Sequence, residues 1–182
     1  TCTISNIRHI HGIFYDEYTD GYWVTTGDND SESKILYSND SFHSLNTIAS
    51  GSQLTRTIQL LFTEEYVYYG TDSPLDQNWI CRIKRKTKKI EKLYKVKSSV
   101  FHGCIRNNEI YFSSAVEPSQ INRYRYCEVL VSQNGKDWNV LESYKKDIFP
   151  MRYFQYGQIF IINNDDYVWL TPFATKHNLE SK

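Results

Sequence analysis

Arginine, histidine and carboxylate side chains recur beside short apolar segments along this chain of 182 residues. Arginine can bind a carboxylate through two parallel hydrogen bonds, carboxylates accept hydrogen bonds from hydroxyl groups, and aromatic rings can pack on the face of a sugar. These residue types together suit a glycan or another polar or anionic small molecule. The residues that we expect to bind such a ligand are Arg8, His9, His11, Asp28, Asp30, Arg56, His102, Arg152 and Tyr156.

Three carboxylates are candidates for catalysis. A glycosidase needs two carboxyl groups about 5–10 Å apart, one of which acts as the acid. Asp28 could pair in this way with Asp72 or with Glu117, but nothing in the sequence sets their separation. These residues could equally cap loops and pair with other charges, so the sequence favours binding over catalysis.

The polar segment 27–32 (GDNDSE) offers alternate oxygen ligands, as the start of a calcium loop does. It lacks the Gly at the sixth position and the distal Glu of an EF-hand. An Asx-rich turn is therefore the prediction, and a divalent cation near Asp28, Asp30 and Glu32 is the alternative.

Two histidines could also bind a metal. His9 and His11 lie two residues apart on an expected strand, so they face the same side and could join His102. Histidines that line a core or channel and bond to neighbouring loops are more common. The sequence thus predicts no metal and no other cofactor.

A repeat of about 44 residues sets the fold prediction. Aromatic β-type segments (YWV, YVY and IYF) begin at residues 22, 66 and 110, so both spacings are 44 residues. Four short strands repeated at about this period are typical of β-propeller blades. We therefore expect an all-β propeller of about three four-stranded antiparallel blades and a partial fourth. In such a fold, the segments that carry the ionisable residues meet at one rim.

The expected units are residues 7–50, 52–97, 98–146 and 150–172, within a propeller domain of residues 1–172. In the last unit, we expect the first strand to run over residues 153–162. Residues 173–182 are expected to form a C-terminal tail, either frayed or a short helical turn. Because most propellers have more blades, we expect the C-terminal portion of a six- or seven-bladed propeller. A compact four-bladed domain is the alternative.

Two segments between expected third and fourth strands carry a family resemblance. The segment 132–138 (SQNGKDW) is similar to the Asp-box of sialidase-like propellers, Ser-x-Asp-x-Gly-x-Thr-Trp, with Asn134 in place of Asp. The segment 38–45 (SNDSFHSL) keeps Ser and Asp but has Phe42 for Gly and Leu45 for Trp. The resemblance, to the sialidase-like Asp-box (BNR-repeat) superfamily, implies a propeller whose binding site lies on the face opposite the boxes.

The resemblance also bears on the site. Sialidases use three arginines from different blades, an Asp acid/base and a Tyr activated by a Glu. Arg8, Arg56 and Arg152 precede three expected first strands, but no Tyr/Glu pair can be assigned. The resemblance implies a ligand-binding propeller. A sialidase or other glycoside hydrolase on the same scaffold and a protein-interaction scaffold are the alternatives.

The balance of charge and the spacing of the cysteines narrow the classes of partner and the cellular location that we expect. The 21 basic and 21 acidic residues balance, which gives no case for nucleic acid, and the longest apolar run, 159–162, is too short to cross a membrane. The four cysteines show no close pairing, which predicts reduced thiols and favours a cytoplasmic location. A basic run is expected to form the solvated face of an outer hairpin. Its members are Arg82, Lys84, Arg85, Lys86, Lys88, Lys89 and Lys92.

Overall fold

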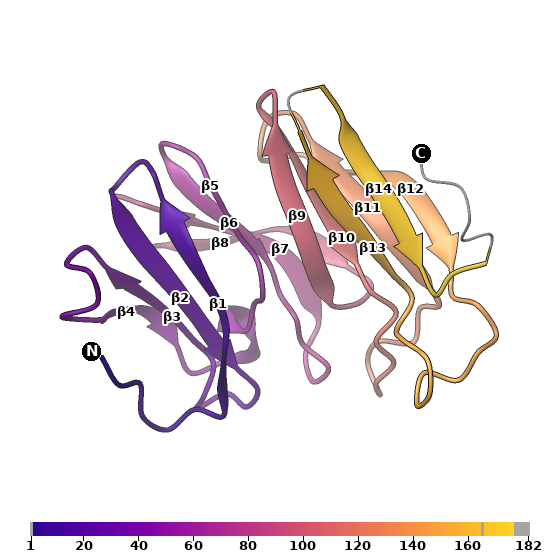
Figure 1. The fold of residues 1–182 in the computed structure, drawn as a ribbon, viewed down its shortest axis with the longest axis horizontal. Coiled ribbons are helices and arrows are strands. Elements are labelled where there is room, and N and C mark those ends of the chain that lie inside the picture. The colour runs from indigo at the N-terminus through magenta and orange to yellow at the C-terminus, as the bar shows by residue number, and fades with distance from the viewer. Residues whose placement is uncertain (1, 165, 177–182) are drawn as a thin grey trace.

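The computed structural model describes residues 2–164 and 166–176, which form an all-β protein of four antiparallel sheets (Figure 1). The first sheet contains β1 (His9–Asp16), β2 (Gly21–Gly27), β3 (Lys34–Ser38) and β4 (Asn46–Ser50). The second contains β5 (Leu60–Phe62), β6 (Tyr66–Gly70), β7 (Asn78–Lys84) and β8 (Ile90–Val96). The third contains β9 (Val100–Arg106), β10 (Glu109–Ser114), β11 (Tyr126–Ser132) and β12 (Asn139–Lys145). A hairpin of β13 (Gln158–Asn163) and β14 (Val168–Phe173) forms the fourth.

Local chemistry explains the turns between these strands. Asn107 and Asn108 join β9 to β10 with φ of 49° and 65°, and Asp20 has φ of 47° between β1 and β2. Asn and Asp tolerate this left-handed conformation better than other non-glycine residues, and hairpin turns require it. The sequence predicts turns at these places, and the structure confirms them.

The sheets pack face to face in the order in which they occur along the chain. Three apolar clusters lie between successive sheets and form the core. Each cluster draws β-branched, aromatic or thiol side chains from both of the sheets that it joins. Representative pairs are Trp23 and Tyr69, Ile80 and Phe112, and Val129 and Ile159.

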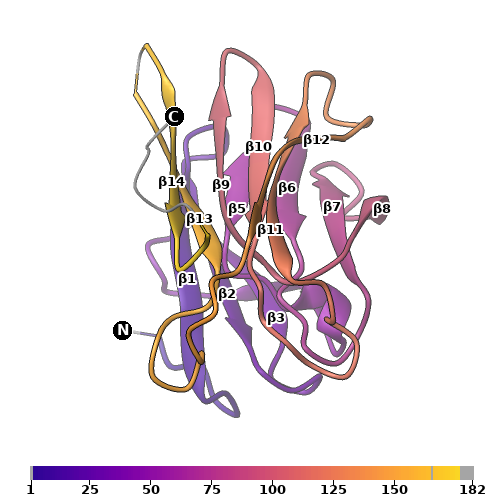
Figure 2. The same ribbon diagram turned by 90° about the vertical axis from the view of Figure 1, so that its right-hand side faces the viewer.

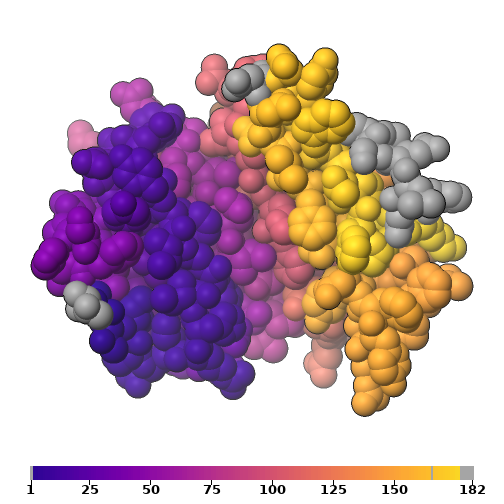
Figure 3. Space-filling view, viewed as in Figure 1, coloured from indigo at the N-terminus to yellow at the C-terminus, as the bar shows by residue number. Residues whose placement is uncertain are grey.

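The first strands of the sheets lie on one side of the molecule. In Figure 1, β1, β9 and β13 lie toward the viewer, and Figure 2 shows β1 on one side with β8 and β12 on the other. In the space-filling view, indigo residues of the first sheet lie on one side of the middle of the molecule, and orange to yellow residues that include the last hairpin lie on the other (Figure 3). The segments that begin these first strands are therefore close together.

The C-terminal part of the chain differs from the sequence prediction. β13 begins at Gln158 rather than Tyr153, because residues 151–154 form a turn in which the amides of Tyr153 and Phe154 donate to the carbonyl of Pro150. β14 extends to Phe173, and Thr175 pairs with Lys146 in an isolated bridge. Residues 173–176 are therefore paired rather than frayed or helical, and residues 177–182 lie outside the described residues.

A single 3₁₀ turn, Gln53–Thr55, is the one helical element in residues 2–164 and 166–176. Within this part of the chain, no helix is long and apolar enough to span a membrane. All four cysteines are free thiols, and three of them are buried.

Side chains organise the turns that connect third and fourth strands. After β3, Asp40 Oδ1 accepts hydrogen bonds from Ser38 Oγ (2.8 Å) and the Ser44 amide (3.0 Å), and Phe42 has φ of 65°. After β11, Asn134 Oδ1 accepts from the amides of the residues two and three positions later, at 2.9 and 2.8 Å. Gly135, directly after Asn134 in this second turn, also has φ of 65°.

Replacing Asn134 with alanine is expected to lower the free energy of unfolding by about 1 kcal/mol, since two backbone donors lose their acceptor. Urea denaturation of Asn134→Ala beside Lys136→Ala, an exposed neighbour in the same turn, measures the effect. Equal unfolding midpoints for the two variants would contradict this role of Asn134.

Candidate functional site

A polar hollow of about 410 Å³ lies where the first three sheets meet on the side of their first strands. Its walls come from the start of β1, the loop after β2, the segment before β5, the loop after β6 and the start of β9. The lining residues are His9, Ile10, His11, Asp28, Arg56, Ile58, Gln59, Asp72, Phe101 and His102.

Strand pairing explains why the first sheet contributes three polar groups to this hollow. β1 runs antiparallel to β2, and His9 pairs with Gly27, the last residue of β2. The next residue, Asp28, therefore lies beside the start of β1. A bulge between Ile10 and Gly12 includes His11 and changes the direction of the strand there.

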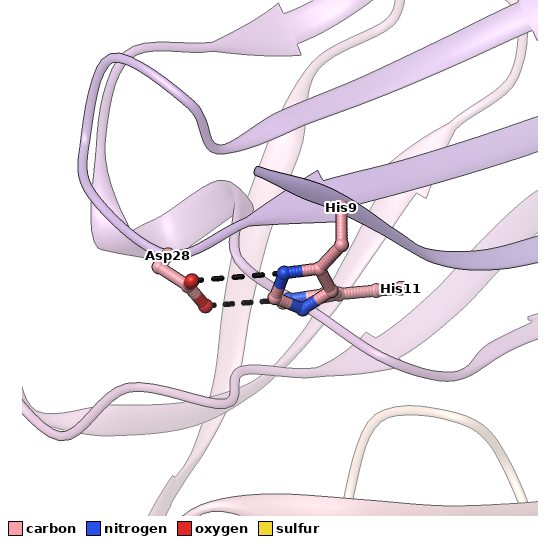
Figure 4. A group of neighbouring side chains, drawn as sticks. All are labelled: His9, His11 and Asp28. Atoms are coloured by element: carbon pink, nitrogen blue, oxygen red, sulfur yellow. Dashed lines mark ion pairs between the residues drawn. The ribbon is translucent and has the colours of Figure 1, made fainter. Parts of the chain in front are cut away.

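The Asp28 carboxylate is surrounded by four nitrogen-bearing side chains. His9 Nδ1 and His11 Nε2 each lie 3.7 Å from one of its oxygens, and Figure 4 shows both imidazole rings beside the carboxylate. Arg8 and Arg56 approach it to 3.8 and 3.6 Å. These separations exceed normal hydrogen-bond lengths, so the two arginines form loose ion pairs with Asp28 and the two imidazoles lie beside it without a hydrogen bond.

His11 is held as a neutral imidazole. Its side chain is only 4% exposed, and Nδ1 lies 3.2 Å from the carbonyl oxygen of Thr57, to which it donates. Burial lowers its pKa, more than offsetting the opposing effect of the Thr57 hydrogen bond, and the charges of His9 and Arg56 lower it further. Since Nδ1 carries the proton, Nε2 presents a lone pair toward Asp28.

His102 lies in the same hollow on β9. Burial lowers its pKa, and its Nε2 lies 3.3 Å from Oε1 of Gln158. Its ring is 4.7 Å from that of Phe160 on β13. His102 thus connects the hollow to the last hairpin.

Arg56 joins two loops of different sheets. Its terminal nitrogens lie 3.6 Å from Asp28 Oδ1 and 3.1 Å from the Asp28 carbonyl oxygen, and its Nε lies 3.4 Å from Asp72 Oδ2. The guanidinium therefore lies between two carboxylates.

Asp72 has an unusual environment for a carboxylate. The residue is 5% exposed, and burial together with the charge of Glu117 raises its pKa to about 7, against the opposing effects of Arg56 and Ser99. Among the described residues, its Oδ1 accepts no hydrogen bond and Arg56 Nε donates none. Glu117, whose charge raises the pKa of Asp72, accepts a hydrogen bond from Ser99 Oγ at 2.5 Å. Asp72 can accordingly exchange a proton near neutral pH.

Four of the residues expected to bind the ligand do not line the hollow, and neither does Glu117, one of the three catalytic candidates. Asp30 is exposed and accepts a hydrogen bond from Gln53 Nε2 at 2.9 Å. Arg8 lies beside the hollow through its contact with Asp28. Arg152 is exposed, with its guanidinium 5.6 Å from the Tyr153 ring centroid.

Tyr156 also lies outside the lining, with its ring 6.4 Å from that of Phe101. Arg152 and Tyr156 lie outside the lining for the same reason. Both belong to the irregular segment before β13 and not to a strand that enters the hollow. An arginine cluster of Arg8, Arg56 and Arg152 therefore does not form around one point in the structure.

The sequence offers two possible sets of metal ligands, and the structure brings a different set of donor atoms together. Glu32 Oε2 accepts from the amide and side chain of Asn29, which fits the predicted Asx-rich turn, and Asp30 accepts from Gln53. In the described parts of the chain, the donor atoms that converge are those of His9, His11 and Asp28, all within 4.8 Å of one another.

Sequence reasoning missed Gln59 and Phe101 as lining residues. Phe101 directly precedes His102, so alternation along β9 would place the two side chains on opposite faces. Both nevertheless line the hollow. No pattern in the sequence distinguishes Gln59 from the other polar residues of the chain.

A second hollow, of about 400 Å³, lies against the first sheet and is lined largely by apolar side chains. Ile4, Ile13, Val24 and Phe42 are among its lining residues, and it has no Arg, Lys, His, Asp or Glu in its lining. The polar hollow is therefore the better candidate for a functional site.

Neither a scan of protein-family models nor a search of curated proteins yields a match to this chain. Its function is therefore inferred from the chemistry of the polar hollow.

Proposed function

We propose that the four sheets are successive blades of a β-propeller of the sialidase-like Asp-box type, and that its polar hollow binds a glycan or another polar or anionic small molecule. Two features support the propeller: the sheets pack face to face in chain order, and their first strands lie on one side. The side-chain hydrogen bonds in the turns after β3 and β11 support the Asp-box type.

The observation that carries the binding proposal is the environment of Arg56 and Asp72. Both are largely buried beside a hollow. Among the described residues, Asp72 Oδ1 has no hydrogen-bond partner, and Arg56 Nε has no hydrogen bond but only the ion pair with Asp72 Oδ2 at 3.4 Å. Buried polar atoms are nearly always paired, and leaving one unpaired costs about 1–3 kcal/mol. A ligand with hydroxyl and carboxyl groups would supply both partners.

The other lining groups suit the same ligand chemistry. Asp28 can accept hydrogen bonds from sugar hydroxyls, and Arg56 can bind a sugar carboxylate. The Phe101 ring offers an apolar face at the edge of the hollow. The volume of about 410 Å³ falls within the range of about 300–1,000 Å³ that is usual for small-molecule sites.

Arg56→Ala is expected to weaken ligand binding at least tenfold, because it removes the cation between Asp28 and Asp72. Calorimetric titration with N-acetylneuraminic acid and glucuronic acid, beside neutral N-acetylglucosamine and glucose, measures this loss. Arg152→Ala is the matched control, since it removes an exposed guanidinium outside the hollow. Circular dichroism verifies that both variants fold.

Three results would contradict the proposal: no panel sugar binds the wild type, Arg56→Ala retains full affinity, or the two variants lose affinity equally. Gln59→Ala provides a second test within the lining that leaves the ion pairs intact. Unchanged binding in both lining variants would place the ligand elsewhere.

Glycoside hydrolysis is the second candidate, and the pKa of Asp72 favours it. A carboxyl group with a pKa of about 7 can serve as a general acid at neutral pH, and Asp28 lies across Arg56 from it. If hydrolysis occurs, chromogenic glycosides are turned over by the wild type and not by Asp28→Asn. Turnover that survives both Asp28→Asn and Asp72→Asn would exclude this pair.

A further inference from the structure

We propose that His9, His11 and Asp28 form a binding site for a divalent transition-metal ion of the Zn²⁺ class. Two imidazoles and one carboxylate are a ligand set that suits zinc and its first-row neighbours. The site shares the polar hollow, but it can exist whether or not the hollow binds a glycan.

The separations fit ligands of a common ion. His9 Nδ1 and His11 Nε2 each lie 3.7 Å from a different oxygen of Asp28. Ligand atoms bound at about 2.0–2.2 Å to one ion lie at most about 4 Å apart, whereas hydrogen-bonded atoms lie closer than 3.7 Å. All three donors are within 4.8 Å of one another, and the His9 side chain, 54% exposed, is free to turn toward the other two.

The backbone leaves room for this arrangement. His9 and His11 are two residues apart on β1, and Figure 4 shows both rings on the side of Asp28. A Cβ at Gly27 would lie 2.4 Å from Cε1 and 2.9 Å from Nε2 of the His11 ring. Only glycine at this position allows the His11 imidazole to lie where it can meet Asp28.

A hydrogen bond behind the site prepares His11 as a ligand. Its Nδ1 donates to the Thr57 carbonyl, which leaves the unprotonated Nε2 facing Asp28. Histidine ligands of metals commonly donate their other ring N–H to a backbone carbonyl or carboxylate in this way.

Two arginines near Asp28 oppose a dication, but each has a second carboxylate partner. Arg8 Nε lies 3.7 Å from Glu32, and Arg56 Nε lies 3.4 Å from Asp72. Asp28, Glu32 and Asp72 thus share two guanidiniums, so neither arginine is paired with Asp28 alone. The Arg8 side chain is largely exposed and can move away when an ion binds.

Three protein ligands leave at least one coordination position for a ligand or water. The three donors come from residues that line the hollow, so that position lies within it. A sugar hydroxyl or carboxylate in the hollow could occupy it. The metal would then add affinity for the same class of polar ligand.

The test uses the whole chain without an affinity tag, treated with EDTA and then freed of it. Calorimetric titration with Zn²⁺ is expected to show one saturable site, and Co²⁺ is expected to give a visible absorption band. His9→Ala, which changes an exposed side chain, should weaken Zn²⁺ binding at least tenfold, as should Asp28→Asn. His102→Ala, in the same hollow, and His43→Ala, on the exposed turn after β3, are the controls and should bind as the wild type does.

Several results would overturn the site: no saturable Zn²⁺ binding, unchanged affinity in His9→Ala and Asp28→Asn, or an equal loss in the control variants. The titration contains no sugar, so its outcome is separate from that of the sugar panel. Saturable binding that depends on His9 and Asp28 supports the metal site even if no panel sugar binds.

Discussion

Replacing Asp16 with alanine is expected to lower the free energy of unfolding by about 3–5 kcal/mol, because it leaves a buried arginine without its counter-ion. Asp16 is fully buried at the end of β1, and both of its oxygens accept from the Arg85 guanidinium of the second sheet. Thr19 Oγ1 and Trp23 Nε1 donate to the same carboxylate at 2.8 and 2.9 Å. Arg85 Nε also donates to the Thr63 carbonyl, so the pair ties the first sheet to the second.

The pH dependence of this effect has a defined sign. Burial alone would raise the pKa of Asp16, but hydrogen bonds from Arg85, Thr19 and Trp23 more than offset it, and the pKa lies below its ordinary value. The stabilisation is therefore complete above the unfolded-state pKa of about 3.9 and is lost as the pH falls through the lower folded-state pKa. The difference between wild type and Asp16→Ala should shrink as the pH falls below about 4.

Urea denaturation of Asp16→Ala at pH 7 and pH 3, beside Glu17→Ala as an exposed neighbour, measures both effects. If Asp16→Ala lowers the free energy of unfolding by less than about 1 kcal/mol at pH 7, the Asp16–Arg85 pair contributes no more than a surface ion pair does. A loss that stays constant down to pH 3 would contradict the assigned pKa direction.

Asp72→Asn is expected to become increasingly stabilising, relative to wild type, as the pH rises from 5 to 8. The folded-state pKa of Asp72 is about 7 and the unfolded-state value is about 3.9. Between these values the folded protein binds more protons than the unfolded chain, so the stability of the wild type falls as the pH rises. Asparagine does not ionise, so the free energy of unfolding of the variant does not fall in this way as the pH rises.

The size of this effect follows from the same two pKa values. One pKa unit corresponds to about 1.4 kcal/mol, so the full effect of the two pKa values is roughly 4 kcal/mol. Part of it is already present at pH 5, so the difference between variant and wild type should change by roughly 2–3 kcal/mol from pH 5 to pH 8. Loss of the charge opposite Arg56 adds an offset that varies much less with pH. Asp76→Asn, an exposed change in the same loop, is the control. A stability difference for Asp72→Asn that does not change with pH would contradict the raised pKa.

Local signals account for the part of the fold that the sequence predicts. Alternating apolar residues and Asn- or Asp-containing turns repeat at 44 residues, and the structure has strands at 22, 66 and 110 accordingly. The last unit departs from the prediction because residues 153–156 (YFQY) are rich in the aromatic residues that strands favour but form an irregular segment in the structure. Nothing in the short pattern distinguishes those two states.

The site is predictable where a residue directly adjoins a strand. His9 and His11 lie in β1, His102 lies in β9, and Asp28 and Asp72 closely follow β2 and β6, so the pairing of the strands brings them together. Arg152 and Asp30 lie further from a strand, and the loops that carry them turn elsewhere. Distance from a strand is not a general rule, because Arg56, four residues before β5, lines the hollow, whereas Arg8, which adjoins β1, does not.

Interactions between sheets are the part that the sequence does not reveal. Arg85 belongs to the basic run expected in solvent, yet its side chain is 11% exposed and is paired with Asp16, 69 residues earlier. The raised pKa of Asp72 comes from burial first and then from the charge of Glu117, in a different sheet's loop. Both pairs depend on how the sheets pack, which no local pattern encodes.

Amide NMR mapping of sugar-acid binding tests the central claim most directly, namely that segments of three sheets form one ligand site. The isotope-labelled chain is titrated with N-acetylneuraminic acid and with glucuronic acid. Chemical-shift changes are expected together at residues 9–11, 28, 56–59, 72 and 101–102, and they should disappear in Arg56→Ala. Changes confined to a single sheet, or to the apolar hollow around Ile4, Ile13 and Phe42, would contradict the claim.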